Sequence, residues 1–125
     1  MDRESLDAVS KSVIGAFFEV SNALGAGFLE KVYERALLRE LGMRGLKAEC
    51  QVPYGVDYKG ESVGDYAADI LVEGCLLVEL KCVEHLGAEH MAQCMNYLKA
   101  SGLSVCLLVN FQRTKVEWRR VVMGF

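Results

Sequence analysis

The chain has 125 residues, of which 52% are hydrophobic and only one is a proline. This composition excludes disordered, collagen-like and proline-rich proteins, and the length predicts that residues 1–125 form a single domain with one core. The formal charge is −3, from 14 basic and 17 acidic side chains. That balance argues against bulk electrostatic binding of a polyphosphate, which usually requires a basic protein.

The charge is distributed unevenly along the chain. Residues 45–84 carry eight acidic and three basic side chains, whereas residues 85–125 carry two acidic and five basic ones. A carboxylate cluster that binds metal, followed by a surface that contacts phosphate, would give this pattern. A solvated acidic face would give it equally well, so the charge distribution leaves both interpretations open.

The cysteines and the N-terminus indicate the compartment. The five cysteines are odd in number and include no C-x-x-C pair, so neither a disulfide framework nor a zinc ribbon is indicated. The first residues are charged and polar, unlike a secretory signal, and no apolar run approaches the ~18 residues of a membrane span. We expect a reduced, cytoplasmic protein with no membrane partner.

Two amphipathic helices are predicted in the first part of the chain. Apolar residues recur every three or four positions over residues 6–24 and again over residues 29–41. This period predicts a first helix over about residues 4–24, ended by Gly25. The second helix should stop near Gly42–Gly45, because glycine is common just after helix C-termini.

Three strands are predicted next. Residues 47–58 and 61–74 are β-prone runs joined at Lys59-Gly60, which indicates a hairpin. Pro53 places the first of these strands at a sheet edge or a bulge, because proline has no amide hydrogen for an inner ladder. Residues 75–82 form a short continuous apolar run, as expected for a buried central strand.

The last part of the chain predicts one more helix and two strands. Residues 87–101 have helical character, residues 104–111 read as a buried strand and residues 116–123 as an amphipathic strand. The predicted order is α-α-β-β-β-α-β-β. A helix between two apolar strands implies a crossover, so we expect an α/β fold (α+β, with a central mixed sheet) on which the helices pack.

The central strands carry the pattern that points to chemistry. Glu79 and Lys81 are two residues apart and share a strand face, and a short turn would bring Asp69 beside Glu79. Two close carboxylates repel unless a cation lies between them, and Mg²⁺ prefers such oxygen ligands. A lysine beside the metal would assist phosphodiester hydrolysis. The alternative is a surface ion pair, but an otherwise apolar strand favours a site.

The helices supply further polar candidates. His90, Gln93 and Tyr97 form one stripe of the third predicted helix and could face the strand ends. For His90 a cap or surface position is the alternative, and for Tyr97 a core position. Glu30 lies in the first turn of the second helix, where acids also stabilise the helix dipole, and Tyr33 one turn later would by default be core.

Together these residues resemble a known family. In chain order they are the segment Gly27–Tyr33 with the pattern G-x-x-E-x-x-Y, then Asp69, Glu79-x-Lys81, His90-x-x-Gln93 and Asn96-Tyr97. In this arrangement the chain resembles the GxxExxY family of the PD-(D/E)XK nuclease superfamily, from about Val13 to Arg120. The spacing Gln93-x-x-x-Tyr97 is also similar to the glutamine-tyrosine motif of RecB-type exonuclease domains.

The resemblance implies a restriction-endonuclease-like core with a metal-dependent active site. Asp69 and Glu79 would bind Mg²⁺ or Mn²⁺, Lys81 would be the catalytic lysine, and Glu30 would help to bind or orient the metal. The helical residues would position substrate, with Gln93 and Tyr97 in the catalytic set and His90 and Tyr33 as further contacts.

Two positions depart from the family pattern. The position two before Asp69, expected to be basic in relatives, is Ala67, and the usual proline before the aspartate is replaced by Ala68. Since Ala67 and Asp69 share a strand face, one phosphate-contacting charge is missing, which bears on substrate affinity rather than on metal binding.

Three functional hypotheses follow. The first is a Mg²⁺- or Mn²⁺-dependent nuclease acting on DNA rather than RNA, the second a nuclease-fold binding or accessory module without independent catalysis, and the third a structural domain with an ion-pair network. So short a core leaves little surface for nucleic acid, so a homodimer or a partner-protein complex is expected. The candidate phosphate contacts, which could also be ordinary surface charges, are Lys99, Arg113, Lys115, Arg119 and Arg120.

Overall fold

The computed structural model describes residues 2–112 and 114–124, and its elements follow the predicted order. The helices are α1 (Arg3–Leu24), α2 (Glu30–Met43) and α3 (Ala88–Ser101). The strands are β1 (Ala48–Tyr58), β2 (Glu61–Val72), β3 (Leu76–Lys81), β4 (Val105–Asn110) and β5 (Glu117–Val122). The α/β class and the order α-α-β-β-β-α-β-β are thereby confirmed.

The five strands form one mixed sheet in the order β1-β2-β3-β4-β5. Neighbouring strands are antiparallel except β3 and β4, which are parallel and connected through α3. The edge position of β1 confirms the prediction from Pro53. The hairpin between β1 and β2 also forms where expected, because Lys59 and Gly60 have φ angles of 49° and 84°. Two successive positive φ angles are typical of the type I′ turn that matches strand twist.

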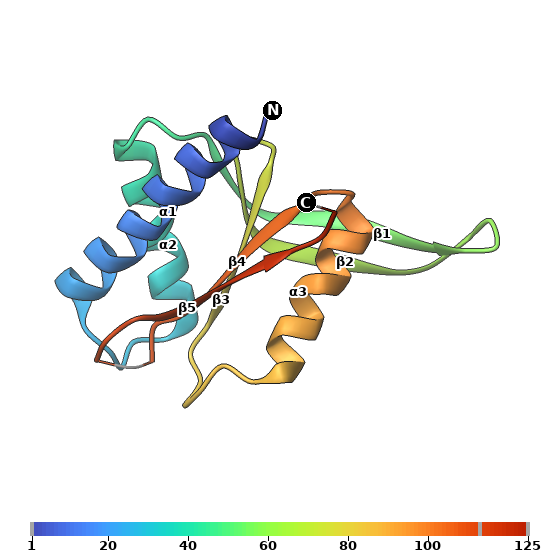
Figure 1. Cartoon of the computed structure of the whole chain (residues 1–125). Coiled ribbons are helices and arrows are strands. Elements are labelled where there is room, and N and C mark those ends of the chain that lie inside the picture. The colour runs from blue at the N-terminus through green and yellow to red at the C-terminus, as the bar shows by residue number, and fades with distance from the viewer. Residues whose placement is uncertain (1, 113, 125) are drawn as a thin grey trace.

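The helices cover the sheet from both sides (Figure 1). The apolar stripes of α1 and α2 pack on one face, where Phe17, Leu37 and Val78 belong to the same buried cluster. Helix α3 covers the other face, where Leu98 packs with Leu108. Burial on both faces explains why β3 and β4 are almost continuously apolar.

The hairpin of β1 and β2 extends as an arm beyond the helices (Figure 1). Its tip is solvent-exposed: Tyr58 retains 62% of its accessible surface and Val63 retains 60%. The base of the arm is packed against the body of the sheet, since Tyr54 and Tyr66 border the cluster under α3. The base of the arm and α3 therefore lie on the same side of the sheet.

Within the described residues, no helix is both long and apolar enough to cross a membrane.

Candidate functional site

The site lies where β2 and β3 separate. Their backbone pairing ends at Ile70 opposite Val78. Beyond that pair the Asp69 amide donates to Glu79 Oε1 at 3.0 Å, and the Leu80 amide donates to Asp69 Oδ2 at 2.8 Å. Side-chain carboxylates thus take the place of backbone acceptors in the ladder. The exchange fixes both carboxyl groups in the gap between the two strands.

The two carboxyl groups are electrostatically unfavourable as a doubly charged pair. Burial, followed by the charge of Asp69, raises the pKa of Glu79 to about 9. Burial also raises the pKa of Asp69, although the Leu80 amide opposes this shift. The two carboxyl groups lie close enough that each affects the pKa of the other. In the absence of a cation the pair therefore holds one shared proton at neutral pH.

This donor set fits a divalent metal ion. A dication would replace the shared proton and relieve the repulsion, and Mg²⁺ is usually held by one or two carboxylates with the rest of its shell completed by water and substrate. Among the described residues, no group of three or more His, Cys, Asp or Glu side chains is already arranged around a metal position. Asp69 and Glu79 are therefore the two protein ligands that fit a divalent ion here. The remaining ligands would join when the metal binds.

Glu30 and Lys81 lie beside the pair. Glu30 is the first residue of α2, and its pKa is raised by partial burial and then by Asp69, while Lys81 and the Cys82 amide oppose the increase. Lys81 closes β3 on the same strand face as Glu79. The structure thus places the four residues Glu30, Asp69, Glu79 and Lys81 in one region of the fold.

Two further side chains at the site were not predicted. The Gln51 amide nitrogen donates to Glu34 Oε2 at 3.0 Å and lies 3.4 Å from Asp69 Oδ1. Glu34 is buried and also pairs with Lys31 at 3.4 Å. Gln51 has a φ of 52°, a strained conformation for a residue other than glycine, and such strain concentrates at functional sites. The i,i+4 spacing of Glu34 from Glu30 could have indicated its position, whereas Gln51 carries no comparable signal.

Helix α3 presents Tyr97 to the carboxylates. Tyr97 is buried, and its pKa is raised by burial and then by the charges of Glu79 and Asp69. Its ring packs edge-to-face on Tyr66 of β2, with 5.0 Å between the ring centroids. Gln93, half-buried one turn earlier, lies on the same side of the helix. Both residues are placed where they could contact a substrate at the strand ends.

Two other candidates have structural roles. His90 Nδ1 accepts a hydrogen bond from the Gly87 amide at 2.9 Å and so caps α3. Tyr33 is fully buried and stacks on Phe111 with 4.8 Å between the ring centroids. Its hydroxyl donates to the Gly25 carbonyl and accepts from the Phe28 amide. Tyr33 therefore holds the loop before Glu30, and its position in the core leaves no face for a substrate.

The basic residues fall into separate groups. Lys99 is exposed on α3. Arg119 lies in the same row of the sheet as Glu79, because Glu79 pairs with Leu108 and Leu108 with Arg119. Arg120 points to the opposite face and pairs with Asp7 of α1 at 3.2 Å.

The other two basic candidates lie after β4. Lys115 is exposed in the loop that leads to β5, and Arg113 lies outside the described residues. Of the five candidate phosphate contacts, Lys99 and Arg119 are thus on the side of the sheet that carries Glu79.

Comparisons with known proteins agree with this geometry. Two solved structures are similar to the chain, each at 16% sequence identity. One is a protein described as SSO0001, with a TM-score of 0.58 over 76% of this chain and 50% of that protein. The other is an alkaline exonuclease, LHK-Exo, from Laribacter hongkongensis, with a TM-score of 0.56 over 75% of this chain and 55% of that protein. The chain thus spans about half the length of each.

A search of curated protein sequences found no match to this chain. The family comparison is more informative, because the PD-(D/E)XK nuclease superfamily matches residues 7–121. That match runs from within α1 to within β5 and includes each residue of the carboxylate site. The chain therefore belongs to the PD-(D/E)XK nuclease superfamily.

Proposed function

We propose that this chain is a divalent-metal-dependent nuclease that hydrolyses phosphodiester bonds, with DNA as its preferred substrate. The observation that carries the proposal is the pair Asp69 and Glu79, held by backbone amides where β2 and β3 separate, with Lys81 following on the same face. Membership of a nuclease superfamily and the similarity to an alkaline exonuclease support it.

The proposal assigns the chain to the GxxExxY family within that superfamily, with a RecB-like glutamine-tyrosine motif. In support, Glu30 begins α2 within electrostatic reach of Asp69, and Tyr33 fixes the loop that leads to it. On the other side of the gap, α3 carries the half-buried Gln93 and the buried Tyr97, whose ring packs on Tyr66 of β2. The motif residues therefore act from two helices on one pair of carboxylates.

Asp69 and Glu79 would hold the metal ion, Mg²⁺ or Mn²⁺, with Glu30 as a third ligand. Such an ion polarises the phosphoryl group and lowers the pKa of a bound water molecule. The Lys81 ammonium stabilises negative charge that develops on the phosphoryl oxygens. Gln51 restrains the Asp69 carboxylate, and Tyr97 covers the site from the side of α3.

The basic surface near the site is small. Among the candidate phosphate contacts, Lys99 and Arg119 lie with Lys81 on the side of the sheet covered by α3. The proposal therefore includes a second copy or a partner protein that enlarges the surface for nucleic acid. Sedimentation of the chain with and without DNA tests whether a second copy is needed. A chain that stays monomeric while it is bound to DNA and cleaves it would contradict this requirement.

Cleavage assays test the catalytic proposal. Purified protein is incubated with single-stranded DNA, double-stranded DNA and RNA in Mn²⁺, in Mg²⁺ or in EDTA. We expect cleavage in the presence of metal only, with DNA preferred, and a loss of about 100-fold or more in Lys81→Ala. Lys11→Ala, which changes an exposed lysine of α1, is the matched control and should retain full activity. Wild-type protein that cleaves none of these substrates, or undiminished cleavage by Lys81→Ala, would refute the proposal.

A further inference from the structure

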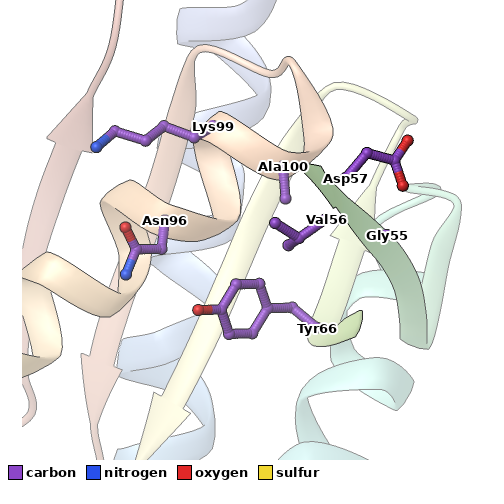
Figure 2. A pocket seen from close by; sticks show the side chains of 7 residues that line it. All are labelled: Gly55, Val56, Asp57, Tyr66, Asn96, Lys99 and Ala100. Carbon is purple, nitrogen blue, oxygen red and sulfur yellow. The ribbon is translucent and has the colours of Figure 1, made fainter. Parts of the chain in front are cut away.

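A pocket opens between the hairpin arm and α3, on the side of the sheet that carries Glu79. Its volume is about 330 Å³, at the small end of the usual range for ligand pockets, roughly 300 to 1,000 Å³. Such a volume suits one flat ring system rather than a peptide or several nucleotides. The lining residues, shown in Figure 2, are Gly55, Val56, Asp57, Tyr66, Asn96, Lys99 and Ala100.

An aromatic pair connects the pocket to the carboxylate site. Tyr66 lines the pocket and packs edge-to-face on Tyr97, at an interplanar angle of 62°. Tyr97 also lies close enough to Glu79 and Asp69 for their charges, after burial, to raise its pKa. The pocket is therefore the next space along the sheet from Glu79, with Tyr97 and Tyr66 between them.

The strand spacing gives the distance. Tyr66 precedes Asp69 by three residues on β2, which corresponds to about 10 Å at roughly 3.3 Å per residue. Nucleotides of a stacked strand rise by about 3.4 Å each, so this distance is two or three nucleotides. A strand whose phosphodiester lies at Asp69 and Glu79 could therefore reach the pocket with a base that close to the bond.

The lining has the chemistry of a base-binding pocket. Figure 2 shows the Tyr66 ring beside Val56, with Ala100 above them and the Tyr66 hydroxyl directed to the side of α3 that carries Asn96. An aromatic face and two small apolar groups suit the flat face of a base. A phenol and a carboxamide provide donors and acceptors for its edge.

The charges at the rim fit a nucleotide rather than an uncharged ring. In Figure 2 the Lys99 ammonium and the Asp57 carboxylate point away from each other. A phosphate on the Lys99 side would therefore meet a cation without facing the carboxylate. Asn96 and Lys99 lie three positions apart on α3, so one side of that helix would contact the strand at the pocket.

We propose that this pocket holds one unpaired base of the nucleic-acid strand, two or three nucleotides from the bond that the carboxylate site cleaves. The inference rests on the proposed nuclease function and deepens it by naming single-stranded or frayed nucleic acid as the substrate. A base inside a duplex cannot enter without leaving its stack and its base pair. The pocket therefore favours strands whose bases are already unpaired.

Binding assays without metal test the pocket apart from catalysis. The anisotropy of a labelled single strand and of a blunt duplex is measured in EDTA for the wild type, Tyr66→Leu, Tyr66→Phe and Asn96→Ala. Tyr66→Leu should weaken single-strand binding about 5- to 100-fold, the range for loss of one stacked base, and change duplex binding less than twofold. Tyr66→Phe retains the ring and should bind nearly as well as the wild type.

The matched control is Tyr58→Leu, which removes an exposed tyrosine at the tip of the arm and should leave both affinities unchanged. Thermal melting identifies any variant that does not fold, and Asn96→Ala, at an exposed position, then provides the test in place of Tyr66→Leu. It should weaken binding of the single strand and not of the duplex. Equal losses on single strand and duplex, or no loss on either, would overturn the inference.

A scan of abasic sites locates the bound base. Each nucleotide of the single strand is replaced in turn by an abasic residue, and affinity should fall at one position for the wild type and at none for Tyr66→Leu. In Mn²⁺ that position should lie two or three nucleotides from the cleaved bond. A flat scan combined with Tyr66-dependent binding of a free nucleoside monophosphate would instead assign the pocket to a free nucleotide. A positive scan without cleavage would refute the nuclease proposal and retain the base pocket.

Discussion

Replacement of Glu79 by glutamine should stabilise the metal-free protein and abolish its stabilisation by metal. Glu79 is 2% exposed and accepts from the Asp69 amide at 3.0 Å, an acceptor role that a glutamine oxygen preserves. The glutamine nitrogen would in addition donate to the Asp69 carboxylate. The substitution therefore retains the hydrogen bonds of the protonated pair and removes the possibility of a second charge.

The magnitude follows from the pKa of Glu79, which is raised from 4.5 to about 9. Between these values the folded state binds a proton that the unfolded state does not, so stability without metal falls as pH rises through that window. Each pH unit in that window lowers the free energy of unfolding by at most about 1.4 kcal/mol. The net effect is smaller than this maximum because neighbouring groups also contribute to the shift. At pH 7 and without metal, we expect the free energy of unfolding of Glu79→Gln to exceed that of the wild type by about 1 to 3 kcal/mol. The difference should decrease towards pH 5.

Urea denaturation in EDTA and in excess Mn²⁺ measures both effects. With Mn²⁺ at 100 times the dissociation constant of the metal complex, the free energy of unfolding of the wild type should rise by about 3 kcal/mol. That of Glu79→Gln should hardly change. The control Glu61→Gln, at an exposed position beside the hairpin turn, should follow the wild type in both conditions. A Glu79→Gln variant that is less stable than the wild type in EDTA, or that gains as much from Mn²⁺, would refute this account of the carboxylate pair.

Three other predictions concern the supporting structure. Gln51→Ala should lower metal affinity by about 10- to 100-fold in calorimetric titration, because the Asp69 carboxylate loses its restraint; unchanged affinity would contradict that role. Tyr33→Phe should lower the free energy of unfolding in urea by about 1 to 3 kcal/mol, because the Gly25 carbonyl loses its donor, and a neutral effect would show that water replaces it. Gly60→Ala should cost about 1 to 2 kcal/mol by the same assay, because its φ of 84° disfavours a side chain; no loss would mean that the turn rearranges.

The elements of this fold are predictable because they depend on local periodicity. The apolar stripes of the helices, the glycines at their ends and the continuous apolar run of β3 specify the element order without reference to long-range contacts. Pro53 and the Lys59-Gly60 turn add the edge strand and the hairpin, since each restricts the backbone directly. The same local rule places Glu79 and Lys81 on one face.

The remaining features of the site depend on long-range contacts. The gap between β2 and β3 forms because carboxylates replace backbone acceptors, and no periodicity encodes that exchange. Gln51 contacts Glu34, 17 positions before it, and Asp69, 18 positions after it. It does so in a backbone conformation that glutamine rarely adopts. The pocket likewise combines the arm with α3.

Tyr33 and His90, which the sequence suggested as substrate contacts, show a related limit. Sequence spacing places Tyr33 and His90 in the right segments, but spacing does not give the direction of a side chain. In the structure the Tyr33 hydroxyl bonds the loop before α2, and the His90 ring caps α3. Tyr33 therefore positions the loop before Glu30, and His90 positions the start of the helix that carries Gln93 and Tyr97.

The central claim is that Asp69 and Glu79 form a divalent-metal site, and a crystal soaked in Mn²⁺ tests it most directly. Anomalous scattering locates manganese without assumptions about the chemistry of the site. The account predicts a single strong peak between the two carboxylates, lost in crystals of Asp69→Asn. A strong peak elsewhere with none between Asp69 and Glu79, or a peak there that persists in Asp69→Asn, would contradict it.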